Sequence, residues 1–240
     1  TGFDTKNYAE TKKISIQMAA RELRYQWLNT LKKKHKFDYI AIAHNSDDVI
    51  ETFFINLIRG TGIAGLHGIA AGSGYIIRPM LPFSRGDIKK YAEEINLKWR
   101  EDSSNATDKY ERNKIRHHLI PLLEEISPQS RKAINHTIEN LRATEQIYLS
   151  VIKAELGKII REKNGKRYLS IARLKNAAIP ALFIYEAIKK FGFNYVQAKE
   201  IEESLGKQAG KQVGSAPYRL TKDRENLVIE ISPAEQRRAI

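Results

Sequence analysis

One stretch of the sequence indicates the fold class: Phe37-Asp38-Tyr39-Ile40-Ala41-Ile42-Ala43. This β-rich apolar run predicts a buried strand, and His44 follows it directly. From Asp47 to Arg59 the apolar residues return at helical spacing. A strand, a sharp turn and a helix are typical of α/β folds, in which ligands bind at the carboxyl ends of parallel strands. We therefore expect a ligand site just after residue 43.

Further elements are expected on both sides of this stretch. They are a helix at residues 15–34, a strand at 75–79, a helix capped by Ser84 with Asp87 at its third position, and a helix at 110–125 disturbed by Pro121. Together these elements predict an incomplete α/β domain over residues 1–125, with a parallel sheet.

The second half of the chain has a different pattern. Residues 127–160 are helical in spacing with few breakers, until Gly165 ends the pattern. Beyond it we expect helices at 171–191 and 195–205, and a β-hairpin formed by 218–221 and 226–231 around a polar turn. The predicted organisation is therefore a helical linker over residues 126–160 and a small α+β domain over residues 161–240.

Composition and charge narrow the functional classes. With 42% hydrophobic and 29% charged residues the chain is globular, and its lack of cysteine excludes disulfides, thiolate metal sites and cysteine nucleophiles. No apolar run approaches the roughly 18–20 residues that span a membrane. Residues 1–125 hold 20 basic and 16 acidic side chains, and residues 126–240 hold 21 and 12. This excess suits a polyanionic partner, although a basic surface without any partner is the plainer alternative.

The strongest chemical cluster lies at the predicted start of the helix after the strand. His44, Asp48 and Glu51 are four and three residues apart, a spacing that predicts one shared helical face. A cap at Asn45 or Ser46, with acids that complement the helix dipole, explains one acid. Because a histidine and three carboxylates crowd this end, we expect Mg²⁺ coordination or proton handling there. A zinc site is less favoured, since a second imidazole is missing.

Two more segments could bind phosphate. The glycines of Arg59-Gly60-Thr61-Gly62 permit close backbone approach to a ligand, but the end of a helix needs glycines as well. Arg112 and Arg116 lie one helical turn apart and could grip a phosphate chain. A solvated helix face is the alternative for this arginine pair.

Six motifs occur in the order in which one known family carries them. They are Ala20-Arg21-Glu22-Leu23-Arg24-Tyr25, His44-x₂-Asp47-Asp48-x₂-Glu51-Thr52, Arg59-Gly60-Thr61-Gly62, Arg78-Pro79-Met80-Leu81, Trp99 to Asn105, and Arg112 to Arg116. Through these motifs residues 1–125 resemble the tRNA(Ile)-lysidine synthetases. The second half resembles the family's first C-terminal domain more loosely, through Gly206-Lys207, Gly210-Lys211 and Tyr218-Arg219-Leu220.

The resemblance implies a partial adenine-nucleotide alpha hydrolase-like domain of the PP-loop ATP pyrophosphatase superfamily. Such enzymes use ATP and Mg²⁺ to adenylate the cytidine at the first anticodon position of tRNA(Ile) with a CAU anticodon. The amine of free L-lysine then displaces AMP and gives lysidine. The resemblance therefore implies a cytoplasmic tRNA-modifying ligase without membrane association, in a family that often forms homodimers.

The resemblance also assigns residues. Arg24, Asp48, Glu51 and Arg116 would be catalytic: the arginines would neutralise phosphate charge, and the acids would either hold the lysine ammonium or help to deprotonate it. No residue is assigned to a metal. Residues beside the substrate or ATP would be His44, Asp47, Arg59, Gly60, Gly62, Arg112 and Asn113. The resemblance does not assign the residues that contact tRNA; candidates among the basic side chains of the second domain are Lys189, Lys190, Lys207, Lys211 and Arg219.

The chain departs from the family pattern in one respect. The family's phosphate-binding loop, Ser-Gly-Gly-x-Asp-Ser, does not occur in it, and Ala71-Gly72-Ser73-Gly74 is not an equivalent. We therefore expect an internal fragment that lacks the N-terminal loop and the further C-terminal domain of many members, and that does not adenylate a substrate by itself.

Two other functions compete with this interpretation. Sibling PP-loop enzymes thiolate tRNA bases, but they use cysteines for sulfur transfer and this chain has none. A non-catalytic RNA-binding module would fit the basic second half and its Tyr and Phe residues. Such a module would be indifferent to changes at Asp48 and Glu51, which separates it from the enzyme.

Overall fold

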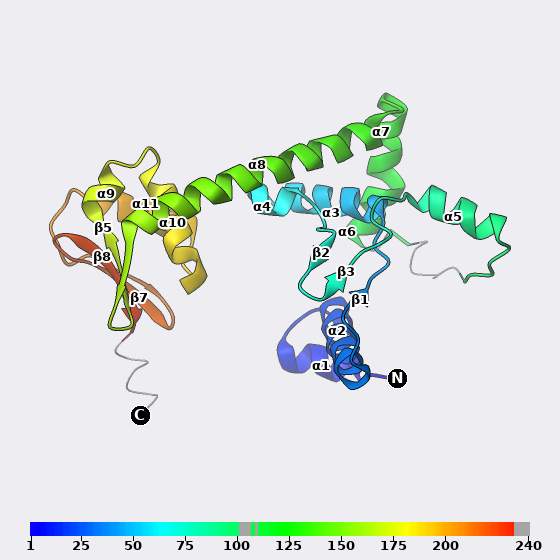
Figure 1. The fold of residues 1–240 in the computed structure, drawn as a ribbon, viewed down its shortest axis with the longest axis horizontal. Coiled ribbons are helices and arrows are strands. Elements are labelled where there is room, and N and C mark those ends of the chain that lie inside the picture. Colours follow the sequence, from blue (N-terminus) through cyan, green and yellow to red (C-terminus); the bar gives the residue numbers. More distant parts are fainter. Residues whose placement is uncertain (101–106, 109, 233–240) are drawn as a thin grey trace. The chain divides into compact units, whose positions relative to one another are not determined.

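The computed structural model describes residues 1–100, 107, 108 and 110–232 (Figure 1). The chain forms two compact units, Thr1–Ala143 and Thr144–Ile240. The long helix predicted at 127–160 is observed as α8, Ser130–Ile159, and it contributes residues to both units. The motif residues Glu101 to Asn105 lie outside the described part of the chain.

The first unit alternates helices with very short strands. Its elements are α1 Thr5–Lys12, α2 Ile16–His35, β1 Ile40–Ala41, α3 Ser46–Ile58, α4 Ile63–Leu66, β2 Gly72–Ser73, β3 Ile76–Ile77, α5 Arg85–Glu94, α6 Glu111–Lys114, a π-helical turn at Ile115–Leu119, and α7 Ile120–Ile126. The predicted α/β class is confirmed, and β1 pairs with β3 in parallel. The expected helix caps at Ser84 and before Asp47 are both present as capping boxes.

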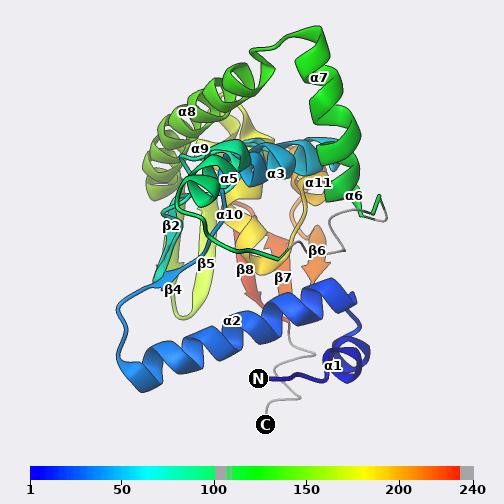
Figure 2. The ribbon, with the colours of Figure 1, turned by 90° about the vertical axis from the view of Figure 1, so that its right-hand side faces the viewer.

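The N-terminal helix α1 was not expected from the sequence pattern, because its eight residues carry few apolar side chains. It packs against α2, and Figure 2 shows α2 along its length with α1 beside it. The Tyr8 hydroxyl donates to Glu22 and accepts from Gln26, both at 3.1 Å. A polar contact therefore fixes this helix pair.

The predicted buried strand at residues 37–43 is much shorter and more exposed than expected. Only Ile40 and Ala41 are strand, and Phe37 and Tyr39 are 57% and 60% exposed. The sheet has the order β1-β3-β2, so β1 has a neighbour on one side only among the described residues. Because β3 offers just two residues for pairing, the rest of the apolar run lacks a partner strand.

The helix expected at 110–125 is broken up just before Pro121. Ile120 donates its N–H to the carbonyl of Ile115, five residues back, which makes a π-helical turn. Proline has no N–H and cannot continue the α-helical series of hydrogen bonds. A change from bonds between residues four apart to a bond between residues five apart, just before Pro121, therefore costs few additional hydrogen bonds. Ile115 then packs against Ile50 of α3, and the small core of this unit forms around them.

The second unit is built on an antiparallel sheet. Its elements after α8 are β4 Ile160–Lys163, β5 Lys166–Ser170, α9 Ile171–Lys175, α10 Pro180–Ile188, a 3₁₀ turn at Lys189–Phe191, α11 Tyr195–Ser204, β6 Gln212–Ser215, β7 Tyr218–Lys222 and β8 Asn226–Ile231. The strand order is β4-β5-β8-β7-β6. The predicted hairpin of β7 and β8 is confirmed.

A second hairpin, β4 with β5, replaces the end that we expected for the long helix. Asn164 and Gly165 join the strands with φ of 51° and 70°. Both residue types tolerate this left-handed conformation, and the Asn-Gly pair is the commonest sequence of a two-residue hairpin turn. The sequence therefore held a clear hairpin signal, which the helical spacing before it obscured.

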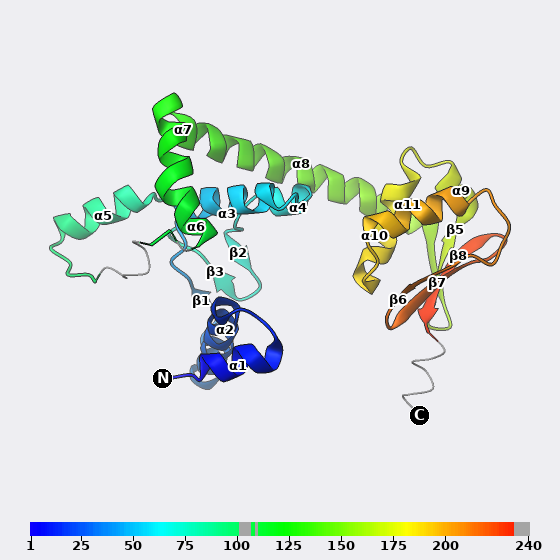
Figure 3. The ribbon, with the colours of Figure 1, turned by 180° about the vertical axis from the view of Figure 1, so that it is seen from behind.

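The sheet of the second unit has one buried face and one open face. Leu169, Leu220, Leu227 and Ile229 are almost completely buried and belong to one apolar core with residues of α10 and α11. Figure 3 shows these two helices beside the sheet. Since side chains alternate along a strand, the residues between these positions form the open face.

No helix in the described ranges combines the length and the apolar composition that crossing a membrane requires.

Candidate functional site

The start of α3 is fixed by reciprocal hydrogen bonds. The Asn45 side chain accepts from the Asp48 N–H at 3.1 Å, and Asp48 Oδ2 accepts from the Asn45 N–H at 3.0 Å. One oxygen of Asp48 therefore serves the helix cap, as the plainer interpretation of the sequence proposed. His44 precedes the cap, so the expectation that it shares a helical face with Asp48 and Glu51 is wrong.

Glu51 is the most completely buried charged residue described, with no exposed surface. Its carboxylate accepts from Arg116 Nε at 2.6 Å and from Arg116 Nη2 at 3.0 Å, a bidentate pair. Arg112 Nε lies 3.3 Å from the same carboxylate. A buried carboxylate is stable only when it is paired in this way. The two arginines predicted to bind phosphate are thus gathered on one buried acid.

The electrostatics of Arg116 follow from this contact. Burial alone would lower the pKa of Arg116, but the hydrogen bond and the charge of Glu51 outweigh burial and raise it. Arg112 is more open, with 38% of its side chain exposed against 16% for Arg116. Its Nη2 donates to Thr52 Oγ1 at 3.0 Å, which holds the guanidinium over α3.

His44 lies beside this cluster and contacts an arginine. Arg78 Nε donates to His44 Nδ1 at 3.0 Å. Since a guanidinium can only donate, Nδ1 must be unprotonated, and the neutral ring carries its proton on Nε2. Burial lowers the pKa of His44, and the charges of Arg78, Arg21 and Arg112 act in the same direction against that of Asp48. The imidazole is therefore held neutral at the carboxyl end of β1.

Helix α2 brings Arg21 within electrostatic reach of this histidine. Arg21 stacks over the Tyr25 ring at 5.1 Å. Arg24, the residue that the motif assigned, is exposed on the same helix. No contact between Arg24 and the cluster is seen among the described residues, and its catalytic role stays a prediction.

Asp47 ties three helices together. One oxygen accepts from the Arg85 N–H at 2.7 Å, at the start of α5, and the other is ion-paired with Arg131 of α8. Arg131 also pairs with Glu124 of α7. The sequence pattern placed Asp47 beside the substrate but gave no sign of Arg131, because the two lie 84 residues apart. The contacts indicate a scaffolding role for this acid.

The remaining residues predicted beside the substrate or ATP lie around α3 and α6. Arg59 pairs with Glu111 at 2.7 Å in an exposed contact, and the buried Asn113 donates to the Thr107 carbonyl at 2.5 Å. Gly60 has φ of +66° where α3 ends, and Gly62 precedes α4 as its cap. The left-handed turn explains Gly60 without a ligand.

A hollow of about 520 Å³ opens next to the start of α3. Its lining includes Ser46, Val49, Arg78 and, from α8, Glu139 and Arg142. Arg78, one of the residues that line this hollow, donates to His44, and the other lining residues are a mixture of polar and apolar side chains.

The carboxylates at this site do not fit a protein-held metal ion. The described residues contain no group of three His, Cys, Asp or Glu side chains that could hold one. Asp47 and Glu51 each give both oxygens to protein donors, and Asp48 gives one. The alternative of Mg²⁺ coordination by these acids is therefore not supported by the geometry.

In the second unit, several of the residues predicted to contact tRNA have partners within the protein. Lys189 pairs with Glu186 at 2.7 Å, Lys211 donates to the Glu200 carbonyl at 2.9 Å, and Arg219 pairs with Glu230 at 2.9 Å. Lys190 lies over the Phe191 ring at 5.1 Å. The exposed Lys207 accepts a bond from Lys222 through its carbonyl. Their contact with tRNA stays a prediction.

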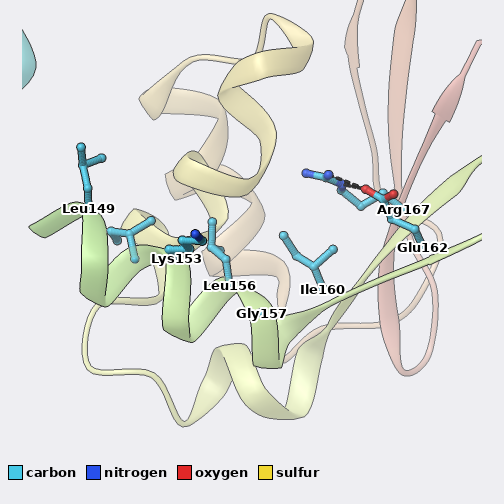
Figure 4. A pocket seen from close by; sticks show the side chains of 8 residues that line it. Leu149, Lys153, Leu156, Gly157, Ile160, Glu162 and Arg167 are labelled. Carbon is cyan, nitrogen blue, oxygen red and sulfur yellow. Dashed lines mark hydrogen bonds and ion pairs between the residues drawn. The ribbon is translucent and has the colours of Figure 1, made fainter.

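Another hollow, in the second unit, is apolar. It has a volume of about 660 Å³ and is lined by Leu149, Leu156 and Ile160 along α8 and β4 (Figure 4). Glu162 and Arg167 form an ion pair at its end. Among the described residues its lining holds no cluster of nucleophilic or metal-ligating side chains.

Comparisons with known proteins agree with the two-unit organisation. A PP-loop domain family matches residues 3–123, and a TilS substrate binding domain family matches residues 162–233. The curated tRNA(Ile)-lysidine synthase of Bacteroides thetaiotaomicron is 41% identical over 237 residues, which are 98% of this chain and 55% of that protein. That of Parabacteroides distasonis is 39% identical over 98% of this chain and 53% of that protein.

The chain therefore spans about half the length of the curated relatives it matches. A solved U34-tRNA thiolase from Methanococcus maripaludis is 25% identical and covers 51% of this chain and 42% of its own. The TM-score of that match is 0.41. Since the PP-loop family matches half of the chain and the TilS domain follows it, the chain belongs to the tRNA(Ile)-lysidine synthase family of PP-loop proteins.

Proposed function

We propose that the complete gene product containing this chain uses ATP to join L-lysine to the first anticodon cytidine of a CAU-bearing tRNA(Ile), and so forms lysidine. The names of the curated relatives and the pairing of a PP-loop domain with a substrate binding domain support this proposal. Under it the partners are tRNA and free lysine. The cytoplasmic location and the homodimer stay predictions.

The observation that carries the proposal is the arginine pair held by Glu51. In the adenylation step the cytidine carbonyl oxygen attacks the α-phosphate of ATP and pyrophosphate leaves, so negative charge must be stabilised on phosphate. Donors that are already oriented do this best, because they need no reorganisation during the reaction. The bidentate contact at 2.6 and 3.0 Å orients Arg116, and the pairing at 3.3 Å orients Arg112.

The geometry also favours different roles for the two acids. Both oxygens of Glu51 already accept from guanidinium groups, so we assign it to positioning the arginines. Asp48 uses Oδ2 for the helix cap, and Oδ1 has no hydrogen-bond partner among the described residues. Asp48 is therefore the acid open to the lysine amine. It would hold the ammonium or take its proton, since only the neutral amine attacks the adenylated base.

His44 would contribute a hydrogen-bond donor. Its neutral ring directs Nε2–H away from Arg78, as a donor to a phosphate or base oxygen. In this proposal ATP supplies the adenylyl group that is transferred to the cytidine. Because the carboxylates of the site do not fit a protein-held ion, these acids have no role as Mg²⁺ ligands in the proposal.

The test is product identification. The complete gene product is incubated with an unmodified tRNA transcript bearing a CAU anticodon, ATP, Mg²⁺ and labelled lysine, and the digested nucleosides are identified by mass. We expect lysidine only when ATP and lysine are both present, together with AMP and pyrophosphate in equal amounts. A thiolated nucleoside, or bound but unmodified tRNA, would overturn the proposal in favour of a thiolase or a binding module.

A further inference from the structure

The second unit contains a strongly basic hollow that the sequence motifs did not indicate. It has a volume of about 500 Å³ and lies where β4, β5 and α9 meet the turn before β8. Five of its lining residues are cationic and only Glu225 is acidic. The cationic residues are Lys158, Arg161, Arg173, Lys175 and Arg224.

Most of these cations are not neutralised by the protein. Lys158 pairs with Glu155 at 2.5 Å. The side chains of Arg161, Arg173, Lys175 and Arg224 are exposed and have no ion-pair or hydrogen-bond partner among the described residues. Cations gathered without counter-charges repel one another, and a bound anion relieves this repulsion. The charges of the hollow therefore favour the binding of an anionic ligand.

The hollow continues onto the open face of the sheet. Arg161 on β4 is opposite Tyr168 on β5, and Ser170 is opposite Asn226 on β8, so a row of cationic, aromatic and polar side chains lines its floor. Along the same face Lys163 is opposite Lys166. An aromatic side chain among cations and polar groups is the composition with which proteins bind the bases and backbone of RNA.

The charged side chains of this open face also favour an anionic ligand. Strand alternation and register leave Glu230 as the acid of the open face within the described strands. Lys166 lies 2.5 Å from one of its oxygens and Arg219 lies 2.9 Å from the other. The single negative charge is thereby neutralised internally, and the remaining cations of the face stay available for an external anion.

We propose that the basic hollow and the adjoining open sheet face bind the sugar–phosphate backbone of the tRNA substrate. This inference rests on the proposed function and gives the substrate binding domain a specific contact surface. A hollow of about 500 Å³ with cations from several elements exceeds the size of one phosphate group and suits a chain of them. Lys189 and Lys211, which the sequence pattern favoured, have internal partners instead.

The first test measures tRNA affinity of charge variants in the complete gene product. R161Q/R173Q removes two unpaired cations from the hollow. K153Q/K199Q removes two exposed lysines elsewhere in the unit and changes the net charge equally. Against a CAU-bearing tRNA transcript we expect R161Q/R173Q to raise the Kd by about tenfold and to reduce the salt dependence by roughly one to two phosphate contacts. The control should stay within about twofold, since it removes no contact. Equal affinities of the two variants would overturn the proposal.

The second test needs no variant. The wild-type protein is acetylated at its lysines with and without excess tRNA, and each site is quantified by mass. We expect tRNA to protect Lys175 while Lys153 and Lys199 stay reactive. Uniform reactivity of the three lysines would contradict the proposal, and protection of Lys175 by polyglutamate but not by tRNA would assign the hollow to an acidic protein instead.

The outcomes also separate this inference from the proposed function. Lysidine formation without protection of Lys175 would leave the function standing and remove the surface. Protection of Lys175 without lysidine formation would keep an RNA-binding surface and remove the ligase.

Discussion

Each of the two units of the chain is stabilised internally by a different kind of interaction. Among the residues that the structure describes, the second unit has a continuous core of seventeen buried apolar residues under its sheet, whereas the core cluster around α3 has three. The first unit instead buries two carboxylates, since Glu51 is completely inaccessible and Asp47 is 8% exposed, whereas a buried charged residue of the second unit is Lys222. Arginines far along the chain pair with both of these acids.

This difference shows where each unit can hold its functional charges. In the first unit the same ion pairs support the helices and would act on the substrate, so structure and chemistry depend on the same residues. In the second unit the apolar core supports the sheet by itself. Surface cations without an internal partner, such as Arg161 and Arg173, are therefore available to a ligand, and replacing them costs little stability.

The largest effect is expected when the buried charge is broken. Glu51→Ala removes the carboxylate that pairs with Arg116 and Arg112, and loss of one partner of a buried pair costs about 3–5 kcal/mol. We expect faster hydrogen exchange in α3 and α6 while β5 and β8 keep their protection. Glu93→Ala, which removes an exposed acid 3.9 Å from Lys89, is the control and should change nothing measurable. An unchanged rate of hydrogen exchange in α3 of the Glu51→Ala variant would show that the ion pair does not stabilise this unit.

The converse substitution removes a buried side chain from the apolar core of the second unit. Leu169 is completely buried in the sheet, and Leu→Ala at such a site costs about 2–5 kcal/mol. We expect Leu169→Ala to destabilise the sheet and to leave the exchange of α3 unchanged. Leu149→Ala, at a position that is 43% exposed, serves as the matched control. Equal loss of protection in both units would show that they do not unfold separately.

Asp48 allows the helix cap to be separated from the chemistry. Asp48→Ala removes the cap acceptor and should destabilise α3 by about 1 kcal/mol. Asp48→Asn keeps an oxygen for the Asn45 N–H and should preserve stability. Since the proposed role with lysine needs the negative charge, we expect both variants to lose lysidine formation and to keep tRNA binding. Full activity of Asp48→Asn would restrict Asp48 to the cap.

A smaller effect is expected from pH in the second unit. Hydrogen bonds from Lys166 and Arg219 hold the pKa of Glu230 below its ordinary value of 4.5. The folded state therefore binds this proton less readily than the unfolded chain, and the stabilisation is present above pH 4.5 and lost as the pH falls. We expect less than about 1 kcal/mol between pH 6 and 3, and a flatter profile for Glu230→Gln in urea unfolding. Identical profiles would show that the contact has no net value.

The smallest effect concerns the imidazole beside the acids. Burial keeps the pKa of His44 below 6.5, so stability from this group is lost as the pH falls below that value. NMR titration should give a midpoint below 6.5 for His44. Because the charge of Asp48 raises this pKa, Asp48→Asn should lower the midpoint further. A midpoint that moves upward would contradict the arrangement of charges around α3.

The parts of the fold that follow from local sequence were predictable. The caps at Asn45 and Ser84 depend on residues three positions apart, and the β7–β8 hairpin depends on one polar turn between two apolar runs. The short β1 was not predictable, because its length is set by the two residues that β3 offers for pairing. The exposed Phe37 follows from the same missing neighbour.

The candidate site shows the same difference between features that local sequence predicts and features that it does not. Its residue types could be recognised by motif, but their partners could not. The contact of Glu51 with Arg116 spans 65 residues and that of Asp47 with Arg131 spans 84. Motif order placed Arg24 at the site, whereas helix geometry brings the charge of Arg21 to His44. The basic hollow of the second unit was missed because its cations come from separate elements with no shared spacing.

The most direct test compares Glu51→Gln with the wild-type complete gene product in two assays, lysidine formation and tRNA binding. Glutamine keeps the volume and two hydrogen-bonding atoms of the side chain but loses the charge that fixes Arg116. We predict that lysidine formation falls by at least about a hundredfold while the Kd for tRNA stays within about twofold. Retained lysidine formation, or a parallel loss of tRNA binding, would contradict the assignment of the chemistry to the buried charges of the first unit.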